Sequence, residues 1–248
     1  MASVIEVKNV KTIFEERVVH EGLNLSINEG EIYGLLGPSG CGKTTLLKEM
    51  VMLQNFSGGS IKVLGHDLKN IKHDEAQKLR KEWGVLFQAG ALFSSLNIKE
   101  NISLPLKEYT DLSQKMIDEI VEFKINLVGL KSADALLYPS QISGGMKKKS
   151  ALARALAMDP KLIFLDEPTS GLDPISAREF DVLIVKLRKL LGLTIVMVSH
   201  DLQSIYDTLD RVAIIDNKKI VYEGNLDNIK NTKSEFIQTF FKGAGSLC

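Results

Sequence analysis

The run Gly37-Pro38-Ser39-Gly40-Cys41-Gly42-Lys43-Thr44 has the glycine spacing and the basic residue of a loop that binds phosphate. Glycines allow the backbone to curl so that successive N–H groups point at phosphate oxygens, and the positive end of a following helix adds to the attraction. Lys43 is expected to reach the β- and γ-phosphates, and the hydroxyl of Thr44 to hold Mg²⁺. This run, together with Thr45 that directly follows it, predicts that the chain binds a nucleotide.

Two adjacent carboxylates follow the apolar run 162–165. Strand alternation sends the side chains of Asp166 and Glu167 in different directions. Asp166 is suited to Mg²⁺, directly or through water, and Glu167 to polarising an attacking water as a general base. Such a pair alone is more often a solvated turn, but the phosphate loop upstream favours the catalytic interpretation. Gln88, which ends another apolar run, is expected to sense Mg²⁺ and the water through its amide.

A second glycine pair precedes the helical run 147–158. Ser143, Gly144 and Gly145 offer N–H donors and a hydroxyl to a phosphate. Because the first loop already accounts for one nucleotide, two phosphate sites per chain predict a sandwich dimer, in which each ATP lies between Lys43 of one subunit and residues 143–145 of the other. Taken alone, an ordinary loop capped by Ser143 is an equally good interpretation.

Short apolar runs bounded by turn residues predict the strands that position these groups. They lie at residues 4–10, 23–28, 31–36, 60–64, 161–166 and 194–198, with a hairpin at 211–222. Apolar residues at helical spacing predict a helix ending at Gly129, another ending at Gly192, and a last one that buries Phe236, Ile237, Phe240 and Phe241. The alternation of strand and helix predicts an α/β fold with a mainly parallel sheet, interrupted by a helical insert.

Composition is that of a globular protein in a reducing compartment. The 248 residues are 44% hydrophobic, and 31 basic residues balance 31 acidic ones, so nothing indicates direct binding to a nucleic acid. Cys41 and Cys248 are the only cysteines and lie far apart without metal-ligand spacing, so neither a disulfide framework nor a zinc site is indicated. No apolar run approaches the length that spans a bilayer and no signal peptide is visible, so membrane association is expected only through a partner.

The order of the motifs resembles that of the nucleotide-binding subunits of ATP-binding-cassette (ABC) transporters over essentially the whole chain. GPSGCGKT is similar to the Walker A loop, Gln88 to the Q-loop, ISGGM to the family signature, LIFLDE to the Walker B strand, residues 170–173 to the D-loop, and His200 to the switch histidine. The resemblance implies a P-loop NTPase core at about residues 1–94 and 160–248, with an N-terminal antiparallel β subdomain, and a helical subdomain specific to ABC proteins at about 95–159, all in one nucleotide-binding domain, 1–248.

The resemblance also implies roles for single residues. Phe14 lies where an aromatic ring stacks on adenine, a contact that contributes about 1–3 kcal/mol by analogy with base stacking. Asp173 belongs to the D-loop beside the nucleotide, and His200 is expected to contact the γ-phosphate. The cofactors implied are ATP and Mg²⁺, and the reaction is ATP hydrolysis coupled to transport.

Departures from the common signature make the chain resemble one subgroup of the family in particular. Ile142 and Met146 stand where the family usually has leucine and glutamine, although the Ser-Gly-Gly core remains. A methionine there, together with the run FQAGALFSSL at 87–96 and Glu100-Asn101, is similar to the ATPases of Mla/Mce-type phospholipid transporters. That similarity implies a multipass permease and an Mce-domain lipid-binding protein as partners, and a peripheral position on the cytoplasmic side of a bacterial inner membrane, with phospholipid moving between inner and outer membranes.

Four further expectations follow from local context. The apolar residues 91–93 are expected to form a docking groove for a permease helix, with packing inside the insert as the alternative. The lysine run 147–149 is expected to be a solvated helix face. His20, His66 and His73 are expected at the surface. Cys41 lies among the phosphate-binding N–H groups at the start of a helix, which favours its thiolate. That Cys41 is only a small residue tolerated between two glycines is an equally good interpretation.

Two alternatives stay open at this point: the ATPase of another ABC importer or exporter, and a non-transport ABC protein of DNA repair or translation. Repair proteins need long heptad arms and translation proteins usually carry two cassettes, whereas this chain has one cassette and an insert of only about 65 residues. A simple P-loop kinase leaves the signature and His200 unexplained. Only the region around residues 87–96 and Met146 favour phospholipid over another transported substrate.

Overall fold

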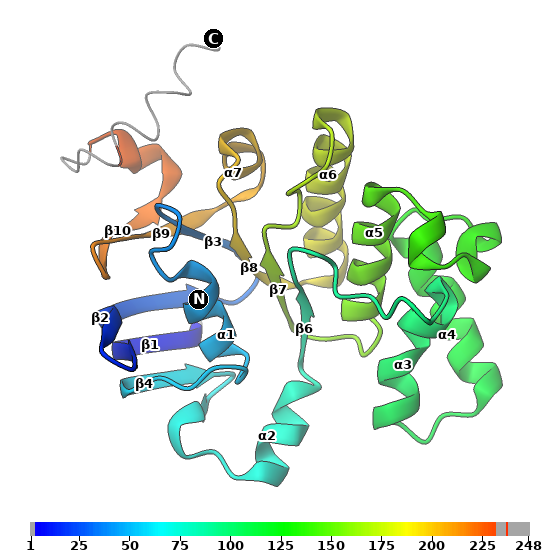
Figure 1. Cartoon of the computed structure of the whole chain (residues 1–248), viewed down its shortest axis with the longest axis horizontal. Coiled ribbons are helices and arrows are strands. Elements are labelled where there is room, and N and C mark those ends of the chain that lie inside the picture. The colour runs from blue at the N-terminus through cyan, green and yellow to red at the C-terminus, as the bar shows by residue number, and fades with distance from the viewer. Residues whose placement is uncertain (1–2, 232–236, 238–248) are drawn as a thin grey trace. The chain divides into compact units, whose positions relative to one another are not determined.

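The structure is a computed structural model that describes residues 3–231 and residue 237. It contains two compact units, one formed by Met1–Ala76 with Thr194–Cys248 and the other by Gln77–Leu193 (Figure 1). The strands are β1 (Ser3–Phe14), β2 (Arg17–Asn28), β3 (Ile32–Leu36), β4 (Gly58–Val63), β5 (His66–Asp67), β6 (Trp83–Leu86), β7 (Leu162–Asp166), β8 (Thr194–Val198), β9 (Arg211–Asp216) and β10 (Lys219–Asn225). The α-helices are α1 (Lys43–Met50), α2 (His73–Arg80), α3 (Ile98–Tyr109), α4 (Gln114–Leu127), α5 (Gly144–Ala155), α6 (Pro174–Leu191) and α7 (Leu202–Thr208).

The first unit begins with an antiparallel sheet of order β2-β1-β4-β5. The sequence predicts a strand at residues 4–10 only. The strand β1 in fact continues to Phe14, with Thr12 fully buried. A buried hydroxyl needs hydrogen-bond partners, and Thr12 has them in His20 and Glu49. The antiparallel β subdomain at the N-terminus is therefore confirmed, with longer strands than predicted.

The same unit contains a second group of strands in the order β10-β9-β3-β8. β3 pairs in parallel with β8 on one side and β9 on the other, and all of its residues are buried, as in strands covered on both faces. The predicted hairpin is confirmed in β9 and β10. Its two central residues, Asn217 and Lys218, have φ of 46° and 68°, as a tight hairpin turn with the twist of its strands requires.

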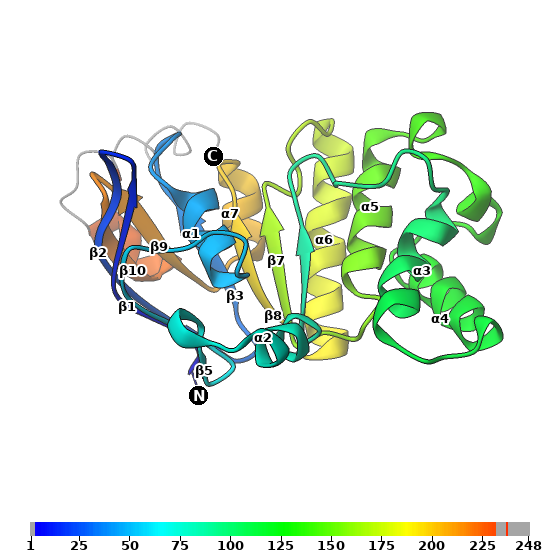
Figure 2. The same ribbon diagram turned by 60° about the horizontal axis from the view of Figure 1, so that its bottom comes forward.

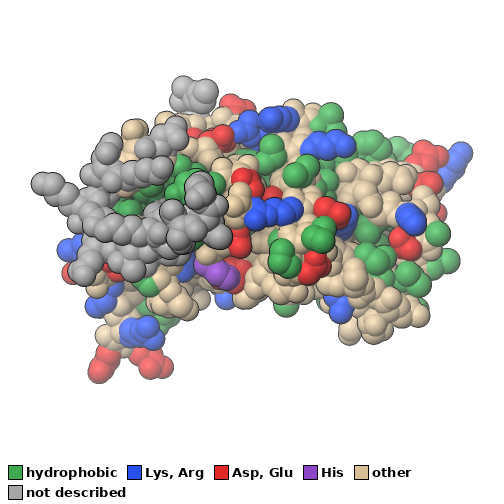
Figure 3. Space-filling model, turned by 90° about the horizontal axis from the view of Figure 1, so that it is seen from above, with side chains coloured by type: hydrophobic (Ala, Val, Ile, Leu, Met, Phe, Trp, Pro, Cys, Tyr) green, Lys and Arg blue, Asp and Glu red, His purple; other side chains and the backbone are tan. Residues whose placement is uncertain are grey.

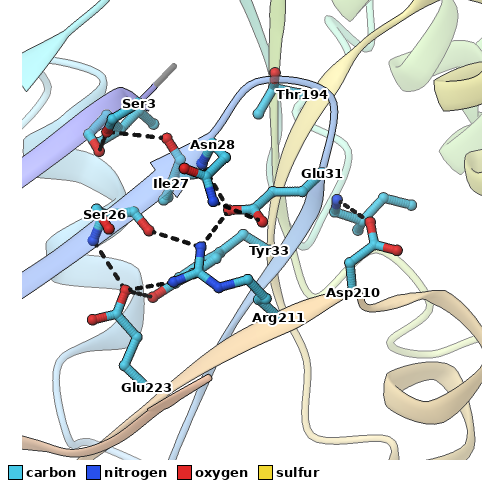
Figure 4. Close-up of polar contacts among 12 residues, drawn as sticks. Ser3, Ser26, Ile27, Asn28, Glu31, Tyr33, Thr194, Asp210, Arg211 and Glu223 are labelled. Atoms are coloured by element: carbon cyan, nitrogen blue, oxygen red, sulfur yellow. Dashed lines mark hydrogen bonds and ion pairs between the residues drawn. The ribbon is translucent and has the colours of Figure 1, made fainter. Parts of the chain in front are cut away.

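A polar network fixes the beginning of β3 (Figure 4). The guanidinium of Arg211 donates to Glu31 at 2.8 Å and to Glu223 at 3.2 Å, and lies 5.3 Å from the centre of the Tyr33 ring. The Tyr33 hydroxyl donates to the same Glu223 oxygen at 2.9 Å. Burial raises the pKa of Tyr33, with the neighbouring Glu223 adding to the effect, so the phenol remains a donor. β3 is thus anchored at the end opposite to the phosphate loop.

The second unit pairs β6 and β7 in parallel and places helices beside them. α5 packs on β6, α6, α3 and α4 (Figure 2). Its end approaches β6 so closely that a side chain at Gly84 would lie 2.1 Å from the carbonyl oxygen of Ala155. Helix ends fall at the predicted glycines, since Gly129 and Gly192 have φ of 72° and 65°. The predicted last helix lies outside the described residues apart from Ile237, which is buried.

The mainly parallel pairing of β3, β8 and β9, and of β6 and β7, confirms the predicted α/β fold. Within residues 3–231 and 237, none of the helices has both the length and the hydropathy of a membrane-spanning segment.

Candidate functional site

The phosphate loop connects β3 to α1, as the sequence predicts. Gly37 has φ of 143°, and a Cβ there would lie 2.1 Å from the carbonyl oxygen of Ile215. Gly42 has φ of 102° and is the N-cap of α1, where a Cβ would lie 2.3 Å from Nε2 of His20. Both positions therefore exclude a side chain, for reasons of conformation and of space. The N-cap itself has no side chain that could occupy the first turn of α1.

Lys43 folds back over this loop. Its Nζ donates to the carbonyl oxygens of Gly37 and Pro38, both at 2.8 Å, and the residue is buried. Thr44 and Thr45 follow in the first turn of the helix and are half-buried. The ammonium group is therefore already held at the loop where the sequence places the phosphates.

The expectation for Cys41 is wrong. Burial raises the pKa of its thiol, and the opposing influence of the Lys43 charge is smaller. The sequence showed the helix start, which favours thiolate, but not the desolvation that raises the pKa.

Phe14 is the last residue of β1, beside the turn into β2. Its side chain is 39% exposed, unusual for a phenylalanine in a strand with a buried face. An exposed ring at a hairpin end suits stacking on a flat partner.

The carboxylates end β7 as predicted. Asp166 is buried, and the chain turns sharply at Glu167, whose φ of 47° is uncommon for a residue other than glycine. Gln88 donates from Nε2 to Oε2 of Glu167 at 2.8 Å and to the hydroxyl of Ser170 at 3.2 Å. The structure therefore brings together Gln88 and Glu167, which lie far apart in the sequence.

Lys148 is a site residue that sequence reasoning missed. The solvated face expected at 147–149 is wrong for this residue, which is buried and donates from Nζ to the carbonyl oxygens of Gln88 and of Glu167, the latter at 3.1 Å. Burial lowers its pKa, while the charges of Glu167 and Asp166 act in the opposite direction. A single ammonium group of α5 thus fixes the backbone at both Gln88 and Glu167.

We expect Lys148→Met to lower the rate of ATP hydrolysis at saturating ATP by at least about tenfold, equivalent to about 1.4 kcal/mol of barrier. The thioether fills the space but cannot donate to the two carbonyl groups, so Gln88 and Glu167 lose their common support. The Michaelis constant should change little, because no phosphate contact is removed. Lys147→Met is the matched control on the same helix, and equal turnover numbers for the two variants would refute this role for Lys148.

Ser143 is the N-cap of α5, and its hydroxyl accepts from the amide of Met146 at 3.2 Å. The capped-loop interpretation is therefore correct for the chain by itself, and it also fixes the amides of Gly144 and Gly145 at a helix start. Ser143, Gly145 and Met146 line an open pocket of about 380 Å³. A pocket lined by a helix N-terminus is a suitable place for an anion.

Two further predicted residues lie at helix starts. Asp173 caps α6 by accepting from the amides of Ile175 and Ser176, and its hydrogen bonds with Ser176 lower its pKa. His200 is exposed in the turn between β8 and α7.

Of the other histidines, His66 and His73 are exposed as expected, but His20 is fully buried. The surface position expected for it is therefore wrong. Its ring packs against Gly42 of the phosphate loop, a contact that no local sequence signal announces.

Comparisons with known proteins identify the family of this chain. Residues 20–170 match the model of the ABC transporter family. The intermembrane phospholipid transport system ATP-binding protein MlaF of Haemophilus influenzae is 40% identical over 97% of this chain and 91% of its own length. The methionine import ATP-binding protein MetN of Clostridium tetani is 41% identical over 91% of this chain and 70% of its own length.

A solved structure is similar in both sequence and fold. The dimeric ATP-binding cassette MJ0796, in a post-hydrolysis state with ADP and Pi, is 30% identical, with a TM-score of 0.81 over 90% of this chain and 98% of that one. The family model matches, MlaF of Haemophilus influenzae is aligned over nearly its whole length, and the fold is shared. The chain therefore belongs to the ABC transporter family.

Proposed function

We propose that this chain is the ATP-hydrolysing subunit of an ABC transporter that moves phospholipid between the inner and outer membranes of a bacterium. The observation that carries the enzymatic part is the 2.8 Å hydrogen bond between the side chains of Gln88 and Glu167. Lys148 stabilises the pair by donating to both of their backbone carbonyl oxygens. A carboxylate oriented by an amide at a strand end is the arrangement expected of a base that activates water.

In this proposal the phosphate loop binds the β- and γ-phosphates of ATP through its amides and Lys43, and Phe14 stacks on adenine. Glu167 takes a proton from the attacking water, which Gln88 orients. His200 contacts the γ-phosphate, and Asp173 lies near the nucleotide in the D-loop. Two kinds of observation support these roles. The side chains of Phe14 and His200 are exposed. Hydrogen bonds hold the side chains of Lys43, Gln88, Glu167 and Asp173.

The donors also suit Mg²⁺. A hydroxyl from Thr44, a carboxylate from Asp166 and the amide oxygen of Gln88 are hard oxygen ligands, and Mg²⁺ in nucleotide sites is usually held by one or two carboxylates together with phosphates and waters. Among residues 3–231 and 237, no group of three or more His, Cys, Asp and Glu side chains forms a separate metal cluster. Bound there, Mg²⁺ would neutralise charge that develops on the phosphate oxygens.

The proposed assembly is a homodimer in which Ser143, Gly144 and Gly145 of one subunit face the ATP on the phosphate loop of the other. The amides at the start of α5 are the donors for this contact. The dimeric state of MJ0796 supports it.

Phospholipid is the proposed substrate because MlaF of Haemophilus influenzae matches nearly the full length of both chains. The proposed partners are a multipass permease, which holds this subunit at the cytoplasmic face of the inner membrane, and an Mce-domain lipid-binding protein. MetN of Clostridium tetani is equally similar in identity but is matched over a smaller share of its length, so import of a small solute is the alternative.

Purification of the complex from native membrane tests this proposal. Mass spectrometry is expected to find a permease, an Mce-domain protein and copurifying phospholipid. Addition of phospholipid in detergent is expected to change the ATPase rate, with an added amino acid as the control. A complex that contains a solute-binding protein and responds to the amino acid alone would contradict the substrate and leave the ATPase assignment intact.

The segment after Gln88 is the proposed docking site for the permease. Arg154 donates to the carbonyl oxygens of Gly90 and Ala91, and the buried Asn101 bonds both backbone groups of Phe93. The Phe93 ring itself is 51% exposed. Figure 3 shows hydrophobic side chains on the surface of the helical part of this unit. An apolar ring presented on a fixed backbone suits contact with a partner helix.

We expect Phe93→Asp to leave the subunit folded and able to bind ATP but to prevent stable assembly with the permease. A carboxylate facing an apolar helix would be desolvated without a partner. Phe123→Asp is the matched control, because Phe123 is also exposed, at 58%, on α4. Pull-down of tagged permease measures assembly. If Phe93→Asp assembles as well as the control and its ATPase activity is unaltered, this segment is not the docking site.

A further inference from the structure

Three polar side chains are buried together beneath the phosphate loop, in the first unit. Thr12 lies on β1 and His20 directly opposite it on β2, while Glu49 lies on α1. Thr12 and His20 have no exposed surface and Glu49 has 1%. Polar groups buried to this degree are costly unless they are paired, so their contacts determine what the cluster does.

The cluster ends on the phosphate loop. Nε2 of His20 lies 3.1 Å from the carbonyl oxygen of Gly42, which also accepts the first backbone bond of α1 from Leu46 at 2.9 Å. On its other side, Nδ1 of His20 lies 2.9 Å from the Thr12 hydroxyl, and that hydroxyl lies 2.6 Å from Oε1 of Glu49. Gly42 immediately precedes Lys43, so the chain of contacts runs from Glu49 to the turn that presents the lysine.

The three contacts require three hydrogens. A carbonyl oxygen can only accept, so Nε2 must carry a hydrogen. One hydrogen is needed between Nδ1 and the Thr12 oxygen, and another between that oxygen and Glu49. A neutral histidine, a threonine hydroxyl and a carboxylate supply only two, which would leave two acceptors facing each other.

One additional proton satisfies every contact. It lies either on His20, as an imidazolium paired with the Glu49 carboxylate, or on Glu49, which then donates to Thr12. In both patterns Nε2–H donates to Gly42. Oε2 of Glu49 lies 3.6 Å from Nδ1 and has no hydrogen bond among the described residues, so the ion-pair pattern also places a positive charge beside the unsatisfied oxygen.

We propose that His20 is a positioning residue for nucleotide binding: held by Thr12 and Glu49, its Nε2–H fixes the Gly42 carbonyl, and with it the turn that directs Lys43 and the amides of α1 toward the phosphates. Thr12 lies two residues before Phe14 on β1, so the same cluster ties the strand that carries the aromatic ring to the phosphate loop. The inference rests on the proposed nucleotide site and adds to it a group that does not touch the nucleotide.

The test measures ATP affinity by titration in the Glu167→Gln background, where hydrolysis does not interfere. His20→Leu has similar bulk and no donor, and we expect its Kd for ATP to rise about tenfold, while His20→Gln, whose amide can donate to Gly42, should recover most of the affinity. In otherwise wild-type protein, His20→Leu should raise KM and leave kcat nearly unchanged. His66→Leu, at an exposed histidine of the same unit, is the control.

Two further variants, Glu49→Gln and Thr12→Val, test the number of hydrogens that the contacts require. They also test the positioning role if His20→Leu does not fold. The amide of Glu49→Gln can donate to Thr12, which reproduces the pattern with a neutral histidine, so ATP affinity should be retained. Thr12→Val removes the link and should weaken ATP binding as His20→Leu does. In nitrogen-15 NMR of the imidazole, Nε2 should carry a hydrogen in the parent and in Glu49→Gln.

The outcomes separate this inference from the proposed function. If the parent binds ATP tightly, and His20→Leu and Thr12→Val bind it equally well, the positioning role is refuted and the nucleotide site remains. A tautomer with hydrogen only on Nδ1 would also refute it, because Gly42 could not then accept. If the parent does not bind ATP, the proposed function itself fails.

Discussion

Glu167→Gln is expected to slow ATP hydrolysis at least about a hundredfold, or about 2.7 kcal/mol of barrier, while ATP binding stays intact. The amide keeps nearly the shape of the carboxylate but cannot take a proton from the attacking water. Its oxygen can still accept the hydrogen bond that Gln88 now donates to Oε2 of Glu167. Phosphate release measures turnover, and titration with labelled ATP measures binding.

Glu119→Gln makes the same chemical change at an exposed position on α4 and serves as the control. Its turnover should equal that of the unmodified protein. Hydrolysis by Glu167→Gln at more than about a tenth of the normal rate would mean that another group activates the water, because loss of a general base typically costs two to four orders of magnitude.

Lys43→Ala is expected to act on binding itself and to raise the Kd for ATP at least about tenfold. A hydrogen bond that involves a charged group contributes about 1.5–3 kcal/mol, and the ammonium group is placed to make such bonds to phosphate oxygens. Alanine also removes the two bonds by which Lys43 holds the carbonyls of Gly37 and Pro38, so the loop loses internal support as well.

Lys48→Ala is the matched control, since Lys48 is an exposed lysine on the same helix. Calorimetric titration with ATP under conditions of slow turnover compares the two. Unchanged ATP affinity and hydrolysis in Lys43→Ala would remove the assignment of the phosphate loop.

Much of the fold follows from local signals. These signals determine structure within a few residues, so the sequence alone places them. They are the short apolar run of β3, the glycines of the phosphate loop, and the positive-φ glycines after α4 and α6. Gln88 and Glu167 are predicted as separate motifs for the same reason. Their hydrogen bond depends on how β6 and β7 pair, which a single sequence does not encode visibly.

The failures share one physical cause. The fold buries His20 and Lys148 and half-buries Cys41, and this burial results from contacts between distant segments. A lysine in a basic run normally faces solvent, and His20 has no motif around it that would indicate another position, so both predictions follow the common case. These two residues are exceptions because each reaches a backbone carbonyl oxygen while buried. His20 contacts that of Gly42. Lys148 donates to those of Gln88 and Glu167.

The central claim is that two copies of this chain complete each other's ATP site, and light scattering of Glu167→Gln tests it most directly. With saturating Mg-ATP we predict twice the mass of one chain, and with ADP the mass of a single chain. Adding Gly144→Asp should abolish the ATP-dependent dimer, because a carboxylate at the start of α5 would repel the phosphates of the facing subunit. A mass of one chain for Glu167→Gln, with bound ATP verified in the same sample, would contradict the composite site.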